Sequence, residues 1–327
     1  MRQARLSFDE FYGATLLRLA AAAIVFAMCF TAVSLAQQPG QKTFSSAEKA
    51  SQALATAAKN NDEKALLEIF GRDGKQIVSS GDEAEDTESR ANFVERYQEM
   101  HRLVKEPDGA TILYIGAHNW PTPIPLMKKG NAWYFDTQAG KKEILYRRIG
   151  RNEISAIRIC QELVAAEREY STQRGEYAKK IFADEGQQDG LYWKSASGEP
   201  ESPIGPLVAS AASGSFVQSQ AARTSSLRGP TPYRGYYFHI LTGEGKNGAK
   251  SYTANGKMTE GFAFVAYPAE YRSSGVMTFI VNQDGVLYEK DLGPKTEVVA
   301  KTMKEYDINS GWHKSEGQQE ETAEQKP

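Results

Sequence analysis

Helical patterns precede strand patterns twice along this chain, and this order constrains its fold more than any other feature. Residues 41–150 begin with amphipathic helical segments and continue with strand-like segments, and residues 151–313 open with one long helix followed by strands. Runs of helices followed by runs of strands are typical of α+β domains. At ~100–200 residues per domain, the 327 residues also fit two domains. We therefore expect one α+β domain over 41–150 and a second over 151–313.

The first domain is expected to contain three helices followed by a small antiparallel sheet. Ser45, with Glu48 three residues later, forms a capping box that predicts the start of the first helix. Apolar residues three or four positions apart predict the third helix over 87–104. The elements expected after it are strands over 110–117, 120–127 and 132–136 and a short helix over 141–148. The pattern resembles the cystatin-like or NTF2-like half-barrel, in which helices pack in the concavity of a curved antiparallel sheet.

The second domain is expected to open with a long helix over 152–174 and to continue with a long loop over 185–232, rich in Gly, Ser, Pro and Gln. Asn282 to Gly285 predicts a tight hairpin turn. The expected strands are 233–241, 261–267, 275–282 and 286–290. A long helix followed by an antiparallel meander resembles the outline of a pilin-like domain. Residues 314–327 contain no large apolar side chain and are expected to be disordered.

The N-terminal segment has the pattern of an export signal. An apolar run from Leu19 to Ala36 follows three arginines and ends in a small-x-small motif before the polar segment that begins at Gln37. These features predict a signal peptide over 1–36 that is cleaved after Ala36. The alternative is a retained anchor, because about 18 apolar residues just suffice to span a bilayer. With cleavage, we expect a periplasmic or secreted protein without a membrane span.

Composition and motifs exclude several classes of function. Lys and Arg number 39 against 41 Asp and Glu, so no global basic field indicates nucleic acid as a partner. Cleavage after Ala36 would leave Cys160 as the one cysteine, and its place on the apolar face of the long helix predicts a buried thiol. The four histidines lack zinc-protease spacing, and neither a nucleophile elbow nor a phosphate-binding loop is present. We therefore predict no catalytic residue, no metal site and no cofactor.

Aromatic and proline residues supply the best candidates for a binding site. Trp120 begins a segment in which three prolines remove backbone donors, so this segment must form an edge strand or a rim. Aromatic side chains in loops can form a groove for a peptide or a glycan. The alternative is that these side chains cover the sheets and are buried. The candidate binding residues are Trp120, Pro123, Asp189, Tyr192, Trp193, Tyr236 and Tyr237.

Several short motifs occur together in the chain. They include Trp120-Pro121 followed by Pro123-Ile124-Pro125-Leu126, Trp133-Tyr134-Phe135-Asp136-Thr137, Asp189-Gly190-Leu191-Tyr192-Trp193 and Ser202-Pro203-Ile204-Gly205-Pro206-Leu207. In combination they resemble a bacterial family known as domain of unknown function 2950, over about residues 42–313. The resemblance implies an exported bacterial envelope protein with no assigned reaction.

These observations favour a non-enzymatic, exported module that binds or scaffolds a protein or a cell-envelope component. The alternative is a carboxylate-based envelope hydrolase, which requires a deep pocket with at least two acids and a raised pKa. The pattern does not distinguish Glu167, Glu169 or Glu270 from other acids. A second alternative is a pilin-related assembly component. That alternative requires an exposed apolar face on the helix over 152–174, and the charges of this helix argue against it.

Overall fold

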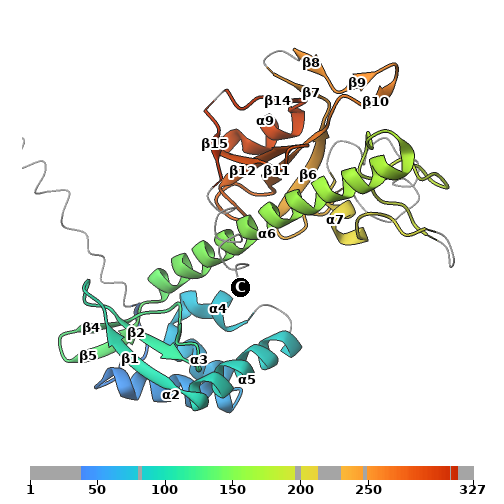
Figure 1. Cartoon of the computed structure of the whole chain (residues 1–327). Coiled ribbons are helices and arrows are strands. Elements are labelled where there is room, and N and C mark those ends of the chain that lie inside the picture. The colour runs from blue at the N-terminus through green and yellow to red at the C-terminus, as the bar shows by residue number, and fades with distance from the viewer. Residues whose placement is uncertain are drawn as a thin grey trace, which may run out of the picture. The chain divides into compact units, whose positions relative to one another are not determined.

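The structure is a computed structural model that describes residues 38–79, 83–195, 200–212, 230–245, 249–309 and 311–315 (Figure 1). The predicted signal peptide over 1–36 and residues 316–327 of the expected tail lie outside these described residues. The expectation of disorder from residue 314 is wrong at its start, because Lys314 pairs with Tyr288 in a sheet and Ser315 is buried. Within them, no helix is both long enough and apolar enough to cross a membrane. The chain divides into two compact units, Met1–Glu143 (unit 1) and Ile144–Pro327 (unit 2), and its fold class is α+β.

The helices of unit 1 follow the expected order, but the first begins one residue late. Ser46, rather than the predicted Ser45, caps this helix, because its hydroxyl accepts the backbone N–H of Lys49 at 3.2 Å. Phe44 is still paired with Trp133 in a β-bridge, so the chain turns into the helix only after it. The helices are α2 (Ala47–Lys59), α3 (Glu63–Phe70), α4 (Lys75–Val78) and α5 (Glu83–Glu99), with a 3-10 turn, η1 (Arg72–Gly74), before α4.

The sheet of unit 1 is antiparallel, with the strand order β1-β2-β4-β5 and with β3 paired to β2. Its strands are β1 (His101–Lys105), β2 (Thr111–Ile115), β3 (Trp120–Pro121), β4 (Leu126–Lys129) and β5 (Ala132–Phe135). The helix predicted over 87–104 is wrong at its end, because α5 stops at Glu99. A turn at Gly109, with φ 90°, brings β1 back onto β2, and the cross-strand hydrogen bonds outweigh the helical spacing of the apolar residues.

The strand predicted over 120–127 is also wrong as one element, because it is divided into β3 and β4. β3 ends at Pro121, although the N–H of Thr122 still donates to the carbonyl of Leu113 at 2.8 Å. Pro123 and Pro125 have no N–H to extend this pairing. The strand predicted over 132–136 is confirmed as β5. Together these elements form two layers, in which α2 and α3 contact β5 and α5 contacts β1 and β2 (Figure 1).

One continuous helix, α6 (Thr137–Arg174), replaces the two helices that were predicted over 141–148 and 152–174. No proline interrupts this stretch, and Asn152, where the second helix was predicted to begin, donates its side chain to the carbonyl of Ser274 instead of capping a helix. A helical glycine such as Gly150 costs only about 1 kcal/mol relative to alanine. The helix therefore continues through the predicted break. The division between Glu143 and Ile144 falls inside it.

Unit 2 is built on a five-stranded antiparallel sheet with the order β15-β13-β12-β11-β6. Every residue of the central strand β11 is buried, and α9 packs against this strand. The predicted hairpin is confirmed, since Gly285 has φ 76° and its N–H donates to the carbonyl of Asn282 at 2.9 Å. The strands are β6 (Tyr236–Leu241), β11 (Ala263–Pro268), β12 (Met277–Asn282), β13 (Leu287–Asp291) and β15 (His313–Lys314).

Smaller elements complete unit 2. A three-stranded sheet has the order β14-β7-β8, and β9 pairs with β10. The described part of the predicted loop over 185–232 contains one short helix, α7. These elements are β7 (Gly243–Glu244), β8 (Lys250–Ser251), β9 (Thr253–Ala254), β10 (Lys257–Met258), β14 (Glu305–Tyr306), α7 (Pro206–Ser210), η2 (Gly293–Lys295) and α9 (Thr296–Thr302).

The apolar side of α6 belongs to the core of unit 2. Buried residues on this helix, from Ala156 to Tyr170, form one cluster with the side chains of the sheet. Polar contacts fix the helix in place. The Glu153 carboxylate accepts the backbone N–H groups of Val276 and Met277 at 2.8 and 3.0 Å, and Arg168 donates to the carbonyl of Gln283 at 2.7 Å.

Candidate functional site

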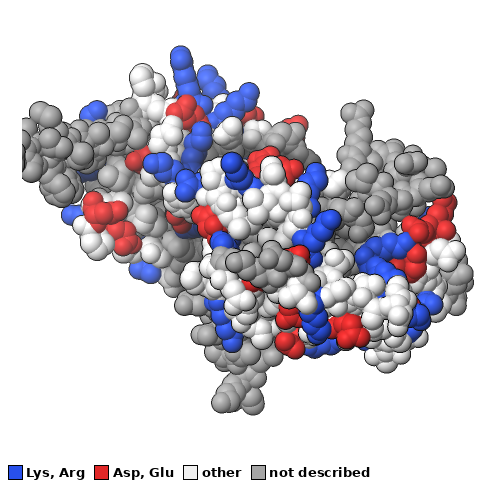
Figure 2. Space-filling model, turned by 90° about the horizontal axis from the view of Figure 1, so that it is seen from above, with Lys and Arg blue, Asp and Glu red and all other residues white. Residues whose placement is uncertain are grey.

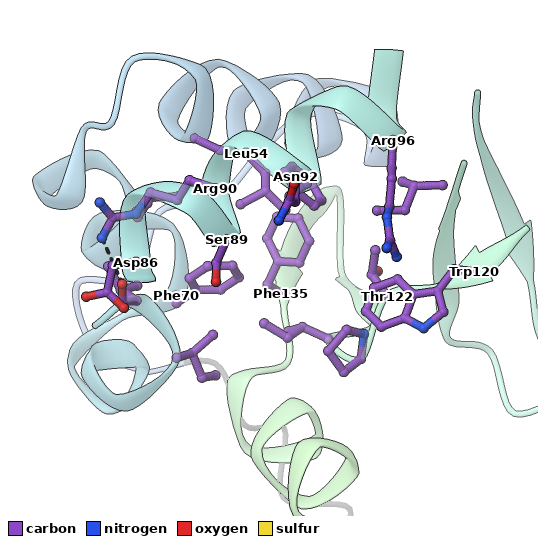
Figure 3. Close-up of a pocket in the computed structure, with 18 of the residues that line it drawn as sticks. Leu54, Phe70, Asp86, Ser89, Arg90, Asn92, Arg96, Trp120, Thr122 and Phe135 are labelled. Carbon is purple, nitrogen blue, oxygen red and sulfur yellow. Dashed lines mark hydrogen bonds between the residues drawn. The ribbon is translucent and has the colours of Figure 1, made fainter. Parts of the chain in front are cut away.

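Unit 1 contains a cavity of about 520 Å³ between its helices and its sheet (Figure 3). Side chains of α2, α3, α4 and α5 form one side, and residues of β2, β5 and the segment 120–124 form the other. A volume of this size lies within the ~300–1,000 Å³ that is typical of small-molecule sites. This cavity is therefore the candidate functional site.

One side of the cavity is an apolar wall, which we define as Leu54, Phe70 and Phe135. All three side chains are buried, and the rings of Phe70 and Phe135 meet edge to face with centroids 5.4 Å apart. Leu54 comes from the apolar face of α2, Phe70 ends α3, and Phe135 ends β5. Because these residues are packed against one another, the apolar wall is formed before any ligand enters.

A further face of the cavity is formed by α5. Asp86, Ser89, Arg90, Phe93 and Arg96 line the cavity at intervals of one, three or four residues, which places them on one face of the helix. Figure 3 shows Ser89 and Arg96 directed from α5 toward the cavity. Sequence analysis predicted a helix here from the spacing of its apolar residues, but it did not single out the polar residues of this face, because polar side chains on a helix are usually solvated.

Arg90 stabilises the helices of unit 1. Its guanidinium donates to the side-chain oxygen of Asn61, in the turn after α2, and to the carbonyl of Val78 at 2.9 Å. Asp86 lies one turn before it on α5. The positive charge of Arg90 is therefore held beside a carboxylate and two further oxygen atoms.

Arg96, Trp120 and Thr122 form the other end of the cavity, which we call the polar end. The Arg96 side chain is exposed and has no hydrogen bond or ion pair to any residue in the described part of the chain. Figure 3 shows it extending beside Trp120 and Thr122. Thr122 is only 7% exposed, and its hydroxyl likewise has no hydrogen-bond partner among the described residues. The polar end thus combines a guanidinium that forms no ion pair with a hydroxyl that forms no hydrogen bond within the described part of the chain.

Trp120 and Pro123, two of the predicted binding residues, line this cavity. Trp120 remains 41% exposed, since β3 pairs only with β2 and the prolines after it end the pairing. The expectation that this segment forms an edge or a rim is confirmed. Gly140 supports the rim from α6, where a β-carbon would lie 2.7 Å from Cγ1 of Ile124.

The other predicted binding residues lie in unit 2, and two of them belong to its core. Trp193 is 6% exposed and donates its indole N–H to the carbonyl of Pro200 at 3.0 Å. Tyr236 is fully buried, and its hydroxyl donates to the carbonyl of Met277 at 2.8 Å. Burial raises the pKa of the Tyr236 phenol, which stays un-ionised. These two side chains present no surface to an external ligand.

Asp189, Tyr192 and Tyr237 make local contacts in unit 2. The Asp189 carboxylate forms an ion pair with Lys180 at 2.6 Å. Tyr192 packs edge to face on Phe182, with ring centroids 5.1 Å apart, and Tyr237 lies 5.7 Å from Tyr267. The predicted residues are thus distributed over both units, and the cavity of unit 1 contains two of them.

Unit 2 also buries two titratable side chains of α6. The prediction that Cys160 is buried is confirmed, and burial raises the pKa of its thiol far above the usual range. Glu167 is fully buried too, and burial raises its pKa to about 8 although its carboxylate accepts the N–H of Ala178. Sequence analysis did not single out Glu167, because neighbouring charges gave this stretch the pattern of a solvated helix.

Among the described residues, no three His, Cys, Asp or Glu side chains are placed to ligate a metal ion.

Charge on the molecular surface is mixed. Figure 2 shows basic and acidic side chains interspersed over the face in view, in keeping with a net charge of -2. The described part of this face carries no extended surface of a single sign. The charge that bears on ligand binding is therefore that of the polar end of the cavity.

Comparison with known proteins gives one match. The model of a family described as "Protein of unknown function (DUF2950)" matches residues 41–315. No curated protein and no solved structure matches the chain.

Proposed function

The chain belongs to DUF2950, a family of proteins of unknown function. From the cavity of unit 1, we propose that the protein is a non-enzymatic module that binds a small, largely apolar ligand. One observation carries this proposal. The cavity has a preformed apolar wall of Leu54, Phe70 and Phe135 and is open to solvent at Trp120. Burial of ~200 Å² of apolar ligand surface would contribute about 5 kcal/mol before the cost of association is subtracted.

The same cavity favours binding over carboxylate-based hydrolysis. Asp86 is the one carboxylate among the described residues that line it. Glycoside hydrolysis of the usual kind needs two carboxyl groups that flank the scissile bond. Glu167, the acid whose pKa is raised, lies in the core of unit 2 and lines no described part of this cavity.

A role as a pilin-related assembly component has less support. Such a role needs an apolar helix face that is free to pack against other subunits. The apolar side of α6 from Ala156 to Tyr170 is instead buried in unit 2. We propose that the pilin-like outline of unit 2 reflects only its order of elements, and that unit 1 is a half-barrel of the cystatin or NTF2 kind. Helices that pack on an antiparallel sheet support the latter proposal.

We also propose that the protein is exported to the periplasm or beyond, with the signal peptide cleaved after Ala36. This proposal rests on the apolar run and the small-x-small motif of the N-terminal segment. Mass spectrometry of the protein recovered from a periplasmic fraction tests it. A mature N-terminus at Gln37 supports cleavage, whereas a full-length membrane-bound form shows that the run is an anchor.

Titration with a neutral apolar fluorophore, N-phenylnaphthylamine, tests the binding function. The wild-type protein should enhance its fluorescence with saturation. Asn92 lines the cavity from an exposed position of α5, so Asn92→Trp should fill the cavity and weaken binding about tenfold or more. Gln98→Trp is the matched control, because Gln98 is exposed on the same helix outside the cavity. Absence of binding to the wild type, or equal binding by both variants, would refute the proposal.

A further inference from the structure

We infer that the ligand of unit 1 is an anionic amphiphile whose head group is bound by Arg96 and whose hydrocarbon body lies against the apolar wall. This inference rests on the proposed binding function and assigns the chemical class of the ligand. It is drawn from the separation of charge and apolar surface within one cavity.

The charges that line the cavity are not equivalent. Arg90 already donates to Asn61 and to the carbonyl of Val78, and Asp86 lies one helical turn away. Arg96 has no such partner among the described residues, although it lines the same cavity. An unneutralised guanidinium beside apolar surface is the complement of an anionic group, because its planar N–H donors match the oxygens of a carboxylate or a phosphate.

Thr122 supplies a second, independent reason to place a polar group here. Its side chain is more than nine-tenths buried, and it lines the cavity beside Arg96 (Figure 3). Its hydroxyl has no hydrogen-bond partner in the described part of the chain. The hydroxyl oxygen is not one of the buried unpaired atoms of the described residues, so it is accessible from the cavity that Thr122 lines. A ligand oxygen at the polar end would accept bonds from both Thr122 and Arg96.

Trp120 completes the polar end. Its indole ring is 41% exposed and lies beside Arg96 in Figure 3. Tryptophan suits a position where one side of a ligand is apolar and the other is wet. The apolar wall continues inward from this point toward Phe135 and Phe70. Head group and hydrocarbon body would therefore contact different residues, and substitutions can test them separately.

Dodecanoate and dodecanol have the same hydrocarbon chain and differ only in the head group. The affinity of each is measured from its displacement of N-phenylnaphthylamine, at concentrations below the critical micelle concentration, and the difference gives the contribution of the head group. The wild type should bind dodecanoate about tenfold more tightly than dodecanol, a difference of about 1.4 kcal/mol, since hydrogen bonds between charged groups are stronger than those to a neutral hydroxyl. Dodecyl phosphate is the second anionic ligand in this displacement experiment. Its affinity relative to dodecanoate distinguishes a phosphate head group from a carboxylate.

Arg96→Gln should abolish the preference for the anion, so that dodecanoate and dodecanol displace the fluorophore at similar concentrations. Thr122→Val, which removes the hydroxyl at nearly constant shape, should lower the affinity for dodecanoate about threefold or more. Arg72→Gln is the matched control, because Arg72 is exposed on η1 and does not line the cavity. Retained fluorophore binding shows that each variant is folded.

The results distinguish this inference from the proposal on which it rests. If the fluorophore binds but neither anion binds more tightly than dodecanol, the assignment of an anionic head group is overturned and the apolar site stands. If Arg96→Gln keeps the full preference for anions, the role of Arg96 is overturned. If the wild type binds neither the fluorophore nor any of the amphiphiles, both proposals fail.

Discussion

The carboxylate of Glu167 accepts the backbone N–H of Ala178 at 2.8 Å inside the core of unit 2. This bond joins α6 to the segment that follows the helix, after the left-handed turn at Gly175. The second carboxylate oxygen of Glu167 has no hydrogen-bond partner among the described residues. Ionisation of a fully buried carboxyl group that has an oxygen without a hydrogen bond is unfavourable in free energy. The stability of unit 2 should therefore depend on pH.

Glu167 should make the protein less stable as pH rises. Burial raises its pKa in the folded state from 4.5 to about 8, so the folded state binds more protons than the unfolded state between these values. The free energy of unfolding should therefore fall across this window, by on the order of a few kcal/mol. Denaturant titrations from about pH 5 to pH 8 measure this slope.

Glu167→Gln should remove most of that slope, since an amide does not titrate. Glu162→Gln is the control, because Glu162 is exposed on the same helix. An unchanged slope in Glu167→Gln would show that another group is responsible.

Gly140→Ala should destabilise unit 1 and narrow its cavity. The added β-carbon would lie 2.7 Å from Cγ1 of Ile124, which lines the cavity. We expect a loss of about 1–3 kcal/mol from overpacking, together with weaker binding of the fluorophore. Gly150→Ala is the control on the same helix, where nothing lies within 4 Å of the added carbon. It should stabilise the protein by about 0.5–1 kcal/mol. Equal thermal shifts for both variants would contradict the predicted steric effect.

Tyr236→Phe should lower stability without changing ligand binding. The substitution removes the hydrogen bond to the carbonyl of Met277 inside the core, at a cost of about 1–2 kcal/mol. Tyr237→Phe is the neighbouring control, because Tyr237 is only half buried. It should change the free energy of unfolding by less than about 0.5 kcal/mol. A loss of fluorophore binding in Tyr236→Phe would show that this tyrosine has more than a structural role.

Cys160 should be inert toward thiol reagents in the folded protein. Its side chain is fully buried, and burial raises the pKa of the thiol, so the reactive thiolate does not form. A maleimide should label Cys160 only in denaturant. Ile154→Cys in a Cys160→Ala background is the positive control, because Ile154 is 53% exposed on the same helix. Rapid labelling of the native protein would contradict the burial of this thiol.

Local patterns in the sequence predicted several features correctly. The turn residues from Asn282 to Gly285 predicted the hairpin, because this backbone geometry depends on the residues in the turn itself. The helical spacing around Cys160 predicted its burial. The prolines after Trp120 predicted a rim, because a residue without an N–H cannot donate to a neighbouring strand and is confined to the edge of a sheet.

The wrong predictions share one cause. Residues 101–104 have apolar positions that fit a helix, but pairing with β2 makes them a strand. The predicted break near residue 150 is absent, because side chains on both sides of Gly150, those of Arg148 and Asn152, donate to the carbonyls of Ser273 and Ser274 and offset its weak helix propensity. In both cases contacts that are distant in sequence decided the local structure.

The sequence by itself determined the α+β class, the order of helices and strands, the position of the main turns and the family to which the chain belongs. Only the tertiary structure placed Arg96 and Thr122 at one end of a cavity and buried the carboxyl group of Glu167. The reason is physical. Propensities and turn geometry act between near neighbours along the chain, whereas a cavity and the burial of a charge depend on which distant segments pack together.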